Sequence, residues 1–384
     1  MTSKKKELEL YIHIPFCIRK CLYCDFLSGP ADESRKTAYM EALAREIEGR
    51  AGELAEYQVS SVFVGGGTPS VAEVGQLARL LWVVREKYQL TEDVEITVEV
   101  NPGTVDREKL EVYRAAGVNR LSIGLQSADD GELASIGRIH TVKQFEEAYG
   151  AAVAAGFENI NVDVMSALPG QNRENYRRTL EYVTGLQPKP AHISAYSLIL
   201  EEGTPLYERV QTGEIELVEE ETDRLMYADT KELLKKAGYE RYEISNYALP
   251  GWECRHNCGY WIRKNYVGFG IGAASLLENV RFRNTDDMRQ YLKSPLECRR
   301  DWQQLTPGER QEEFMFLGLR LTEGISTDAF AAEFGVTMEQ VYGDVIRKNL
   351  QDGLLVCAEN GARIALTERG LDLANYVMSQ FLQD

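Results

Sequence analysis

Long apolar runs are missing from this sequence of 384 residues, although 44% of its residues are hydrophobic. A bilayer-spanning helix needs about 20 consecutive apolar residues, so we do not expect an integral membrane protein. A secretory signal is missing too, because the basic start (Met1–Lys6) runs directly into the alternating segment Leu8–Ile14 without a long apolar stretch or a small-residue cleavage site. We therefore expect the protein in the cytoplasm.

Basic charge and histidine are also scarce. Lys and Arg number 43 against 60 Asp and Glu, which gives a formal net charge of −17, and the chain has only four histidines. A field of this sign repels phosphate backbones, so we expect no nucleic-acid partner. The length and apolar content suffice for one large domain and a small one.

Strand-like and helix-like segments alternate over the first half of the chain. The strand-like segments are Leu8–Ile14, Ser60–Val64, Glu95–Val100, Arg120–Gly124, Asn159–Met165 and His192–Leu200, and the helix-like ones are Ala38–Glu48, Val74–Lys87, Arg107–Ala116, Thr141–Ala155 and Arg173–Leu186. This alternation predicts an α/β fold with βαβ units on a parallel sheet. Six units predict an open, partial (β/α)6 barrel.

The pattern changes near Pro307. Short helices are predicted over Gly308–Leu321, Thr327–Phe334 and Met338–Asn349, followed by a hairpin over Leu354–Leu366 and a closing helix over Leu366–Leu382. This order predicts a small winged-helix-like α+β domain at the end of the chain. We expect a core barrel over 1–245, a flanking segment over 246–300 and the C-terminal domain over 301–384.

Three of the seven cysteines, Cys17, Cys21 and Cys24, lie within eight residues directly after the first predicted strand. In a reducing compartment, clustered cysteines indicate metal binding or catalysis before disulfides. Thiolates are the ligands of iron–sulfur clusters, and three of them leave one iron of a cubane open. A zinc site would need a fourth ligand such as His13, and zinc sites usually pair their cysteines in separate knuckles. The spacing therefore predicts a [4Fe–4S] cluster.

Polar or glycine-rich residues follow the next four predicted strands, at the point where each strand ends. The glycine triplet Gly65–Gly67 follows the second strand, Glu99 ends the third, Gln126 follows the fourth and Asp163 lies on the fifth. Because α/β barrels build their sites at the carboxyl ends of the strands, these residues predict a ligand site beside the cysteines.

With their spacing of three and two residues, the cysteines resemble those of the radical-SAM family, as do Tyr23 and the stretch Gly65–Pro69. Further motifs resemble the branch that contains oxygen-independent coproporphyrinogen III oxidase: Tyr11–Cys17, Glu99–Pro102, Gly124–Gln126, Gly137–Arg138 and Asp163–Gly170. The resemblance implies S-adenosylmethionine contacts at Tyr11, Tyr23, Gly66, Gly67, Thr68, Glu99, Gln126, Arg138, Asp163, Ser197 and Ala274. Taken alone, each of these could instead belong to an ion pair on the surface or the barrel rim, and this alternative is favoured for Arg138 if its side chain is exposed.

Two departures separate the chain from the oxidase. Phe26 stands where the oxidase has a fourth cysteine, and only a short segment precedes Leu8, where the oxidase has an N-terminal extension over its active site. Both departures resemble the HemW heme chaperones, which implies a protein that binds heme and passes it to an acceptor, for which the family suggests a respiratory protein at the membrane. The alternatives are a coproporphyrinogen III oxidase and a radical-SAM enzyme acting on an unrelated small molecule.

A third motif resembles the His-Asn-x-x-Tyr-Trp stretch that is implicated in heme handling by HemW-like proteins. The resemblance implies heme binding by His256, Asn257, Tyr260 and Trp261. Histidine can ligate heme iron and aromatic rings can stack on the macrocycle. The alternative is a structural loop whose histidine and asparagine satisfy backbone groups.

The remaining cysteines carry no assignment. Cys254 and Cys258 flank His256, but the order Cys-x-x-Cys-His of attached c-type heme is not met. Packing residues, a weak metal site or a thiol for heme attachment stay open for this pair. We expect Cys298 and Cys357 to be buried or incidental.

Overall fold

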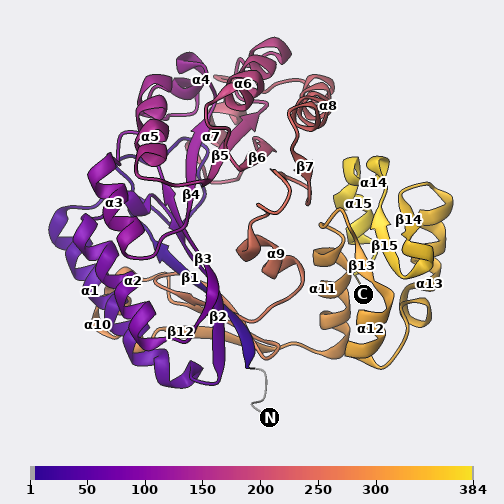
Figure 1. Cartoon of the computed structure of the whole chain (residues 1–384). Coiled ribbons are helices and arrows are strands. Elements are labelled where there is room, and N and C mark those ends of the chain that lie inside the picture. Colours follow the sequence, from indigo (N-terminus) through magenta and orange to yellow (C-terminus); the bar gives the residue numbers. More distant parts are fainter. Residues whose placement is uncertain (1–4, 383–384) are drawn as a thin grey trace.

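The computed structural model describes residues 5–382, so Met1–Lys4 of the basic start lie outside the described residues. Its main feature is a curved sheet whose first six strands are parallel neighbours (Figure 1). These strands are β1 (Lys6–Ile14), β2 (Tyr57–Gly66), β3 (Leu90–Val100), β4 (Arg120–Gln126), β5 (Asn159–Ser166) and β6 (His192–Ser197). The predicted α/β class and partial barrel are confirmed.

Helices cover the outer, convex face of this sheet (Figure 1). They are α1 (Glu33–Arg50), α2 (Val74–Lys87), α3 (Arg107–Ala115), α4 (Asp130–Ser135), α5 (Val142–Ala154) and α6 (Arg173–Gly185), with short 3₁₀ turns η1 (Ala51–Leu54) and η2 (Pro69–Val71) between them, and α7 (Pro205–Gln211) and α8 (Glu220–Lys236) after β6. Several of them begin within a residue of their predicted start.

Side-chain caps fix where these helices begin. Asp32, Asp106 and Asn172 each accept a hydrogen bond from the backbone N–H of the third residue of α1, α3 and α6. Thr141 and Gln144 form a reciprocal capping box on α5. Each such cap stabilises a helix by about 1 kcal/mol, which is why these short polar residues mark the boundaries in the sequence.

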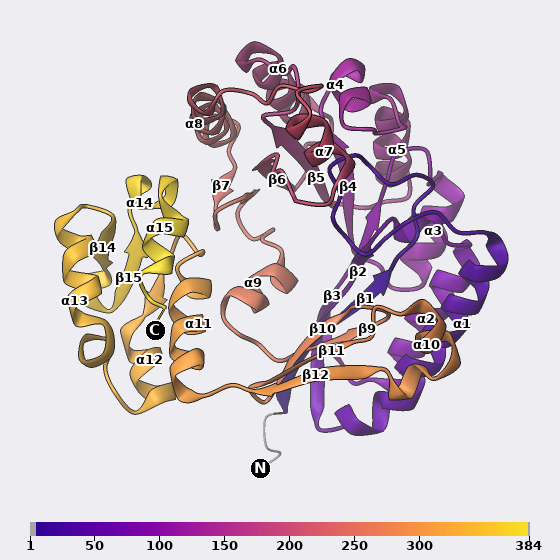
Figure 2. The same cartoon turned by 180° about the vertical axis from the view of Figure 1, so that it is seen from behind.

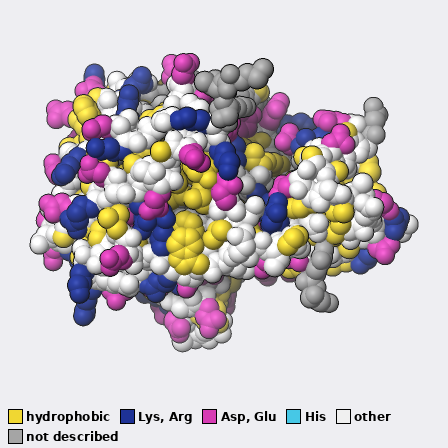
Figure 3. Space-filling view, turned by 90° about the horizontal axis from the view of Figure 1, so that it is seen from below, with side chains coloured by type: hydrophobic (Ala, Val, Ile, Leu, Met, Phe, Trp, Pro, Cys, Tyr) yellow, Lys and Arg dark blue, Asp and Glu magenta, His cyan; other side chains and the backbone are white. Residues whose placement is uncertain are grey.

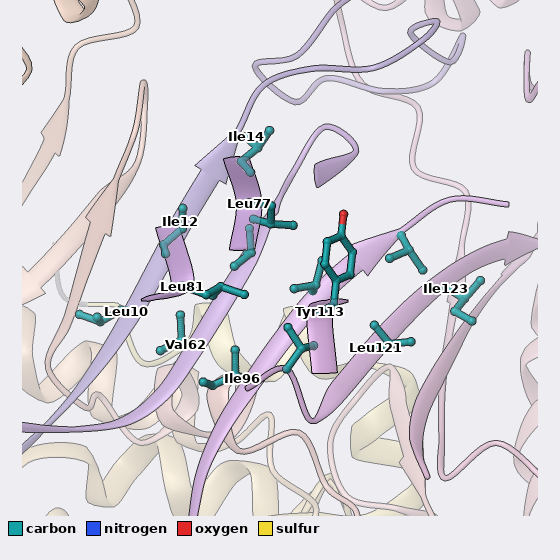
Figure 4. Close-up of a cluster of buried hydrophobic side chains, with 14 of the residues drawn as sticks. Leu10, Ile12, Ile14, Val62, Leu77, Leu81, Ile96, Tyr113, Leu121 and Ile123 are labelled. Carbon is teal, nitrogen blue, oxygen red and sulfur yellow. The ribbon is translucent and has the colours of Figure 1, made fainter. Parts of the chain in front are cut away.

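The core lies between the sheet and these helices. Leu10 and Ile12 of β1 point toward the same apolar layer as Leu77 and Leu81 of α2, and all four are buried (Figure 4). Burial of apolar surface contributes about 25 cal/mol per Å². Since successive side chains of a strand point to opposite faces, the residues between them, such as Tyr11, point to the concave side. That side is lined mostly by polar residues and is where a ligand can be held.

Short strands extend both edges of the sheet. β8 (Asn246–Ala248) pairs antiparallel with β6, and β7 (Glu240–Arg241) pairs antiparallel with β8. At the other edge β9 (Tyr266–Phe269) pairs in parallel with β1 and is followed by antiparallel β10 (Ala274–Leu277), β11 (Val280–Asn284) and β12 (Arg299–Gln304). Within residues 5–382 the sheet thus has twelve strands, in the order β12-β11-β10-β9-β1-β2-β3-β4-β5-β6-β8-β7. The segment expected only to flank the barrel contributes strands to both edges.

One helix, α9 (Arg255–Trp261), lies on the concave side of the sheet rather than outside it (Figures 1 and 2). Gly259 allows this close approach, because a Cβ atom there would overlap the carboxylate of Glu9 on β1. The helix therefore closes the concave side next to the first halves of the strands. The remaining short elements of this part are α10 (Met288–Lys293) and η3 (Pro295–Glu297).

The end of the chain forms a separate small unit beside the open side of the barrel (Figures 1 and 2). It contains α11 (Pro307–Gly318), β13 (Ile325–Ser326), α12 (Thr327–Phe334), α13 (Met338–Gln351), β14 (Leu355–Ala358), η4 (Glu359–Gly361), β15 (Arg363–Leu366), α14 (Glu368–Asp372) and α15 (Ala374–Ser379). Its sheet, in the order β13-β15-β14, and its apolar core are its own, as expected for a small α+β domain. The single closing helix predicted over 366–382 is wrong, because the backbone at Leu373 (φ −116°, ψ 26°) separates α14 from α15.

Ion pairs of an arginine with a buried side chain join the two units. Arg263, whose side chain is 4% exposed, pairs with Glu313 of α11 (3.1 Å) and Glu333 of α12 (2.9 Å). The guanidinium of Arg320, after α11, lies 4.1 Å from the ring centroid of Trp261 at the end of α9. The C-terminal unit is thereby attached to the barrel through α9 and the turn after it.

The surface carries charges of both signs. On the face seen from below in Figure 1, acidic and basic side chains are interspersed, and hydrophobic side chains gather near the centre (Figure 3). Over residues 5–382, none of the helices combines the length and the apolar character that crossing a bilayer requires.

Candidate cofactor site

A cavity of about 550 Å³ opens where the parallel strands end, on the concave side of the sheet. The loop between β1 and α1, indigo in Figure 2, passes over this edge and carries the three clustered cysteines. The sequence-predicted residues that line the cavity are Cys17, Cys21, Cys24, Tyr23, Gly66, Gly67, Thr68, Glu99, Gln126, Arg138, Asp163, Ser197 and Asn257. The fold thus brings together side chains from the ends of all six parallel strands and the loops after them.

Backbone hydrogen bonds anchor the cysteine loop at both ends of its short span. The N–H of Cys17 donates to the carbonyl of Gly29 (3.0 Å). The N–H of Leu22 donates to Ile136 (3.0 Å), and the carbonyl of Leu22 accepts from Leu206 (2.9 Å). Because the loop is tied to α4 and α7 as well as to itself, the three half-buried free thiols are held on one wall of the cavity.

The donor set fits an iron–sulfur cubane better than a single metal ion. Among the described residues, no three His, Cys, Asp or Glu side chains are placed to surround one ion. A cubane offers a different iron to each thiolate, so its cysteines need not converge on one centre. His13, the fourth ligand that zinc would need, has both ring nitrogens within hydrogen-bonding distance of other groups: Nδ1 of the Tyr11 hydroxyl (3.0 Å) and Nε2 of the Leu27 carbonyl (2.9 Å).

Burial disfavours the thiolate forms of these cysteines while no metal is bound. It raises the pKa of Cys17 and of Cys21 above the ordinary value, while the Thr68 hydroxyl near Cys17 and the Arg138 guanidinium near Cys21 act in the opposite direction. A bound metal stabilises thiolates strongly, so binding is expected to release their protons.

The glycine triplet is needed because two backbone segments approach closely. A Cβ atom on Gly67 would lie 2.7 Å from the carbonyl oxygen of Phe16 and 3.0 Å from Sγ of Cys17, and a Cβ on Gly66 would lie 2.5 Å from the ring of His13. Gly66 also has a φ of +112°, which disfavours residues with a side chain. The end of β2 thus packs directly against the start of the cysteine loop.

A chain of polar contacts connects Arg138 to the cysteine loop. Nη1 of Arg138 donates to Oδ1 of Asn101 (2.8 Å), Nδ2 of Asn101 donates to the Thr68 hydroxyl (2.7 Å), and that hydroxyl lies 3.7 Å from Sγ of Cys17. Among the described residues Arg138 forms no ion pair, so it is not the surface or rim pair considered above. Asn101 was not among the predicted site residues, although its position two residues after Glu99 at the end of β3 could have indicated it.

Two partly buried carboxyl groups face the same cavity. Glu99 accepts a hydrogen bond from the N–H of Gly66 (3.1 Å), and burial together with the nearby Asp163 carboxylate raises the pKa of Glu99 to about 7. Asp163 accepts from Nδ2 of Asn161 (2.7 Å), and burial raises its pKa as well. Both groups are therefore able to bind a ligand that supplies hydrogen-bond donors or positive charge, which would favour their ionised forms.

Two further predicted residues at the cavity have defined partners. Gln126, at a φ of +72°, accepts a hydrogen bond from the Tyr196 hydroxyl (3.3 Å), and Ser197 donates to Asp223 (2.8 Å). Tyr11 and Ala274 do not line the cavity: the Tyr11 ring stacks on Phe63, and Ala274 lies exposed at the start of β10. Their predicted role as cofactor contacts stays a prediction.

The structure does not bring the predicted heme residues together on an open surface. His256 is 1% exposed, with Nδ1 2.8 Å from the Ser61 hydroxyl and Nε2 3.0 Å from the Tyr260 hydroxyl. Trp261 packs under Arg320, and Asn257 alone of the four lines the cavity. Heme ligation by His256 therefore requires α9 to rearrange.

The other cysteines lie apart from this site. Cys254 is buried with its thiol 3.6 Å from Glu95, and Cys298 is buried near Glu46. Cys357 is exposed on β14. Nothing in these surroundings assigns the Cys254–Cys258 pair.

Comparison with known proteins agrees with this geometry. Residues 11–183 match the Radical SAM superfamily model and residues 305–373 match the HemN C-terminal domain model. Coproporphyrinogen III oxidase (HemN) from Escherichia coli, described as a radical SAM enzyme, has the same fold, with a TM-score of 0.84 over 98% of this chain and 90% of that one, at 23% sequence identity.

Other relatives are more similar in sequence and align over almost the whole chain. The chain is 37% identical to the heme chaperone HemW of Lactococcus lactis, covering 99% of this chain and 98% of the relative. It is 32% identical to the heme chaperone HemW of E. coli, covering 99% of this chain and all of the relative. Because both relatives align over nearly their whole length at more than 30% identity, the chain belongs to the HemW family within the radical SAM superfamily.

Proposed function

We propose that this protein is a heme chaperone, which binds heme and transfers it to an acceptor protein while carrying a [4Fe–4S] cluster and S-adenosylmethionine. The observation that carries the proposal is the near full-length similarity to proteins named heme chaperones, which includes both the barrel and the C-terminal unit. A respiratory protein at the membrane is the class of acceptor that we favour, and the cytoplasm is the compartment in which we expect the transfer to start.

Membership of the radical SAM superfamily implies the cluster and S-adenosylmethionine. Cys17, Cys21 and Cys24 are the proposed cluster ligands. When bound, the cluster can supply an electron to the sulfonium of S-adenosylmethionine. The proposed contacts to that molecule are the predicted residues named above. Of these, Glu99 and Asp163 offer carboxylates to its hydroxyl and amino groups.

Binding of S-adenosylmethionine is expected to depend on the ionisation of Glu99. Its pKa of about 7 means that the carboxyl is protonated in mildly acidic solution and cannot act as a charged acceptor. Affinity should therefore fall as the pH drops below about 7, by at most about tenfold per pH unit. Titration calorimetry of the cluster-loaded protein across this range measures the effect.

The variant Glu99→Gln should flatten this dependence of affinity on pH, whereas Glu92→Gln, at an exposed position of the same strand, should keep it.

In the ligand-free protein, the free energy of unfolding depends on pH in the opposite direction. The raised pKa of Glu99 means that the folded chain binds the proton more tightly, so its contribution to stability falls as the pH rises from 4.5 to about 7. If the affinity of Glu99→Gln for S-adenosylmethionine changes with pH as in the wild type, another group causes the pH dependence of binding.

The proposed function is tested by anaerobic titration of the cluster-loaded protein with heme, followed by absorbance. We expect stoichiometric binding and transfer to an apo heme protein used as acceptor. Absence of heme binding would contradict the proposed function. His256→Ala and Trp261→Ala test the predicted heme motif in the same assay, and unchanged affinity in both would show that the motif has a structural role.

The oxidase remains the alternative enzyme function. Anaerobic incubation with coproporphyrinogen III, a reductant and S-adenosylmethionine distinguishes it. A chaperone is expected to leave the tetrapyrrole unchanged. Clean formation of protoporphyrinogen would replace the proposed function by the oxidase.

A further inference from the structure

Large apolar side chains are exposed around the mouth of the cofactor cavity. Ile18, Phe26, Ile139 and Ile199 are 56%, 61%, 50% and 68% exposed, and all four line the cavity. They come from three separate loops: the cysteine loop, the segment after α4 and the segment after β6. Exposed apolar residues scattered singly need no explanation, but a group converging on one opening marks a binding surface. We refer to these four residues as the apolar rim.

Two cations lie beside the apolar rim. Arg19 and Lys20 line the same mouth, and Nζ of Lys20 is positioned by a hydrogen bond to the Phe26 carbonyl (2.9 Å). Asp25 and Glu201 line it too, so the mouth is balanced in charge although the chain carries a formal charge of −17. A ligand with carboxylates can therefore approach this opening more favourably than the acidic remainder of the surface.

The mouth also contains a histidine with a ring nitrogen to spare. His140 is 5% exposed but, unlike His256, lines the cavity next to the apolar rim, and its Nε2 lies 3.2 Å from the Leu125 carbonyl. Within residues 5–382 no hydrogen-bond partner reaches its Nδ1. His13, His192 and His256 each have both ring nitrogens within hydrogen-bonding distance of a partner.

The surroundings of His140 suit a metal ligand. Burial, followed by the charge of Arg138, lowers its pKa to about 4, so the ring is neutral at physiological pH. A neutral imidazole that donates its other N–H to a backbone carbonyl is the usual arrangement of a histidine bound to a metal.

We propose that the mouth of the cavity is the heme-binding site: the macrocycle lies on the apolar rim, the propionates pair with Arg19 and Lys20, and Nδ1 of His140 ligates the iron. A flat apolar ring that carries two carboxylates and a metal matches all three features of the opening. The inference rests on the proposed function, because it names the surface that binds heme, and it places that surface away from His256 of α9, which does not line the cavity.

The apolar rim is tested by heme titration of cluster-loaded Phe26→Ser and Ile199→Ser variants, which change two different loops. Loss of this apolar contact should weaken heme binding about tenfold in each variant. Trp82→Ser is the matched control, because Trp82 on α2 is also 61% exposed but lies outside the cavity lining, and it should bind heme like the wild type. Iron content verifies that the cluster is intact in every variant.

The iron ligand is tested with His140→Gln, whose side-chain amide can still donate to the Leu125 carbonyl but is not a heme ligand. Its heme complex should show a shifted Soret band, and added imidazole should restore the wild-type spectrum. Heme at the mouth should also slow the exchange of bound S-adenosylmethionine with labelled S-adenosylmethionine in the wild type.

The outcomes separate the two proposals. If the wild type binds no heme, the proposed function fails. If the wild type binds heme but Phe26→Ser and Ile199→Ser bind it equally well, or if His140→Gln keeps the wild-type spectrum, the site proposed here is wrong. Unaltered heme binding by the rim variants would leave the apolar rim as a surface for a protein partner.

Discussion

Replacing Cys17 by alanine is expected to abolish the cluster. Anaerobically reconstituted wild-type protein should contain about four irons per chain, as a cubane requires. Cys17 is tied to Gly29 and packs against Gly67, and no other described thiol lies on this wall of the cavity except Cys21 and Cys24. With one of three thiolates gone, iron content and the charge-transfer absorbance of the cluster should fall close to zero.

The matched control is Cys258→Ala, which removes another half-buried free thiol that lies on α9 outside the cavity lining. It should retain the full iron content. Circular dichroism of Cys17→Ala separates loss of the cluster from loss of the fold. Full iron in a folded Cys17→Ala protein would contradict the assignment of this ligand.

The second large effect is expected from Gly67→Ala, a change of a single methyl group. The added Cβ would meet the Phe16 carbonyl at 2.7 Å, and the neighbouring strands cannot simply separate. They are joined by hydrogen bonds from the N–H of Gly67 to Ile14 (2.9 Å) and from the N–H of Thr68 to Phe16 (2.7 Å). Overpacking of this kind costs about 3 kcal/mol and must displace Cys17 or break these bonds.

We therefore expect Gly67→Ala to lose most of its iron and to melt at a lower temperature, measured by iron analysis and thermal unfolding. Gly150→Ala on α5 is the control, because a Cβ there meets no atom within 4 Å. It should keep its iron and gain up to about 1 kcal/mol in stability, since alanine favours a helix over glycine. Equal iron content in the two variants would show that the approach of Gly67 to the cysteine loop is not required.

The repeating part of the fold could be predicted because its signals are local. Val74–Lys87 and Thr327–Phe334 are helices over the residues that their apolar periodicity indicates. The edge strand β12 was not predicted, because it reads Arg-Arg-Asp-Trp-Gln-Gln without an apolar alternation and is defined only by its pairing with β11. Pairing of that kind leaves no period in the sequence.

In the candidate site, too, some residues could be predicted from the sequence and others could not. Cys17, Glu99 and Asp163 could be predicted to line one cavity because each lies on or directly after a recognisable strand. Asn101 acts by connecting Arg138 to Thr68, and a contact between three strand ends is a property of the assembled sheet. The burial of His256 could not be predicted for the same reason. The surrounding motif suggests a ligand, but the residue is buried because α9 lies on the concave side of the sheet.

The ion pairs of Arg263 give the C-terminal unit a role in neutralising charge. The barrel segment contributes an almost fully buried guanidinium, and the carboxylates that balance it, Glu313 and Glu333, both belong to the C-terminal unit. A barrel cut away after Gln304 would lose both counter-ions together with the helices that cover this guanidinium, so water would have to stabilise its charge in their place. The C-terminal unit is therefore an electrostatic complement of the cofactor barrel rather than a detachable appendage.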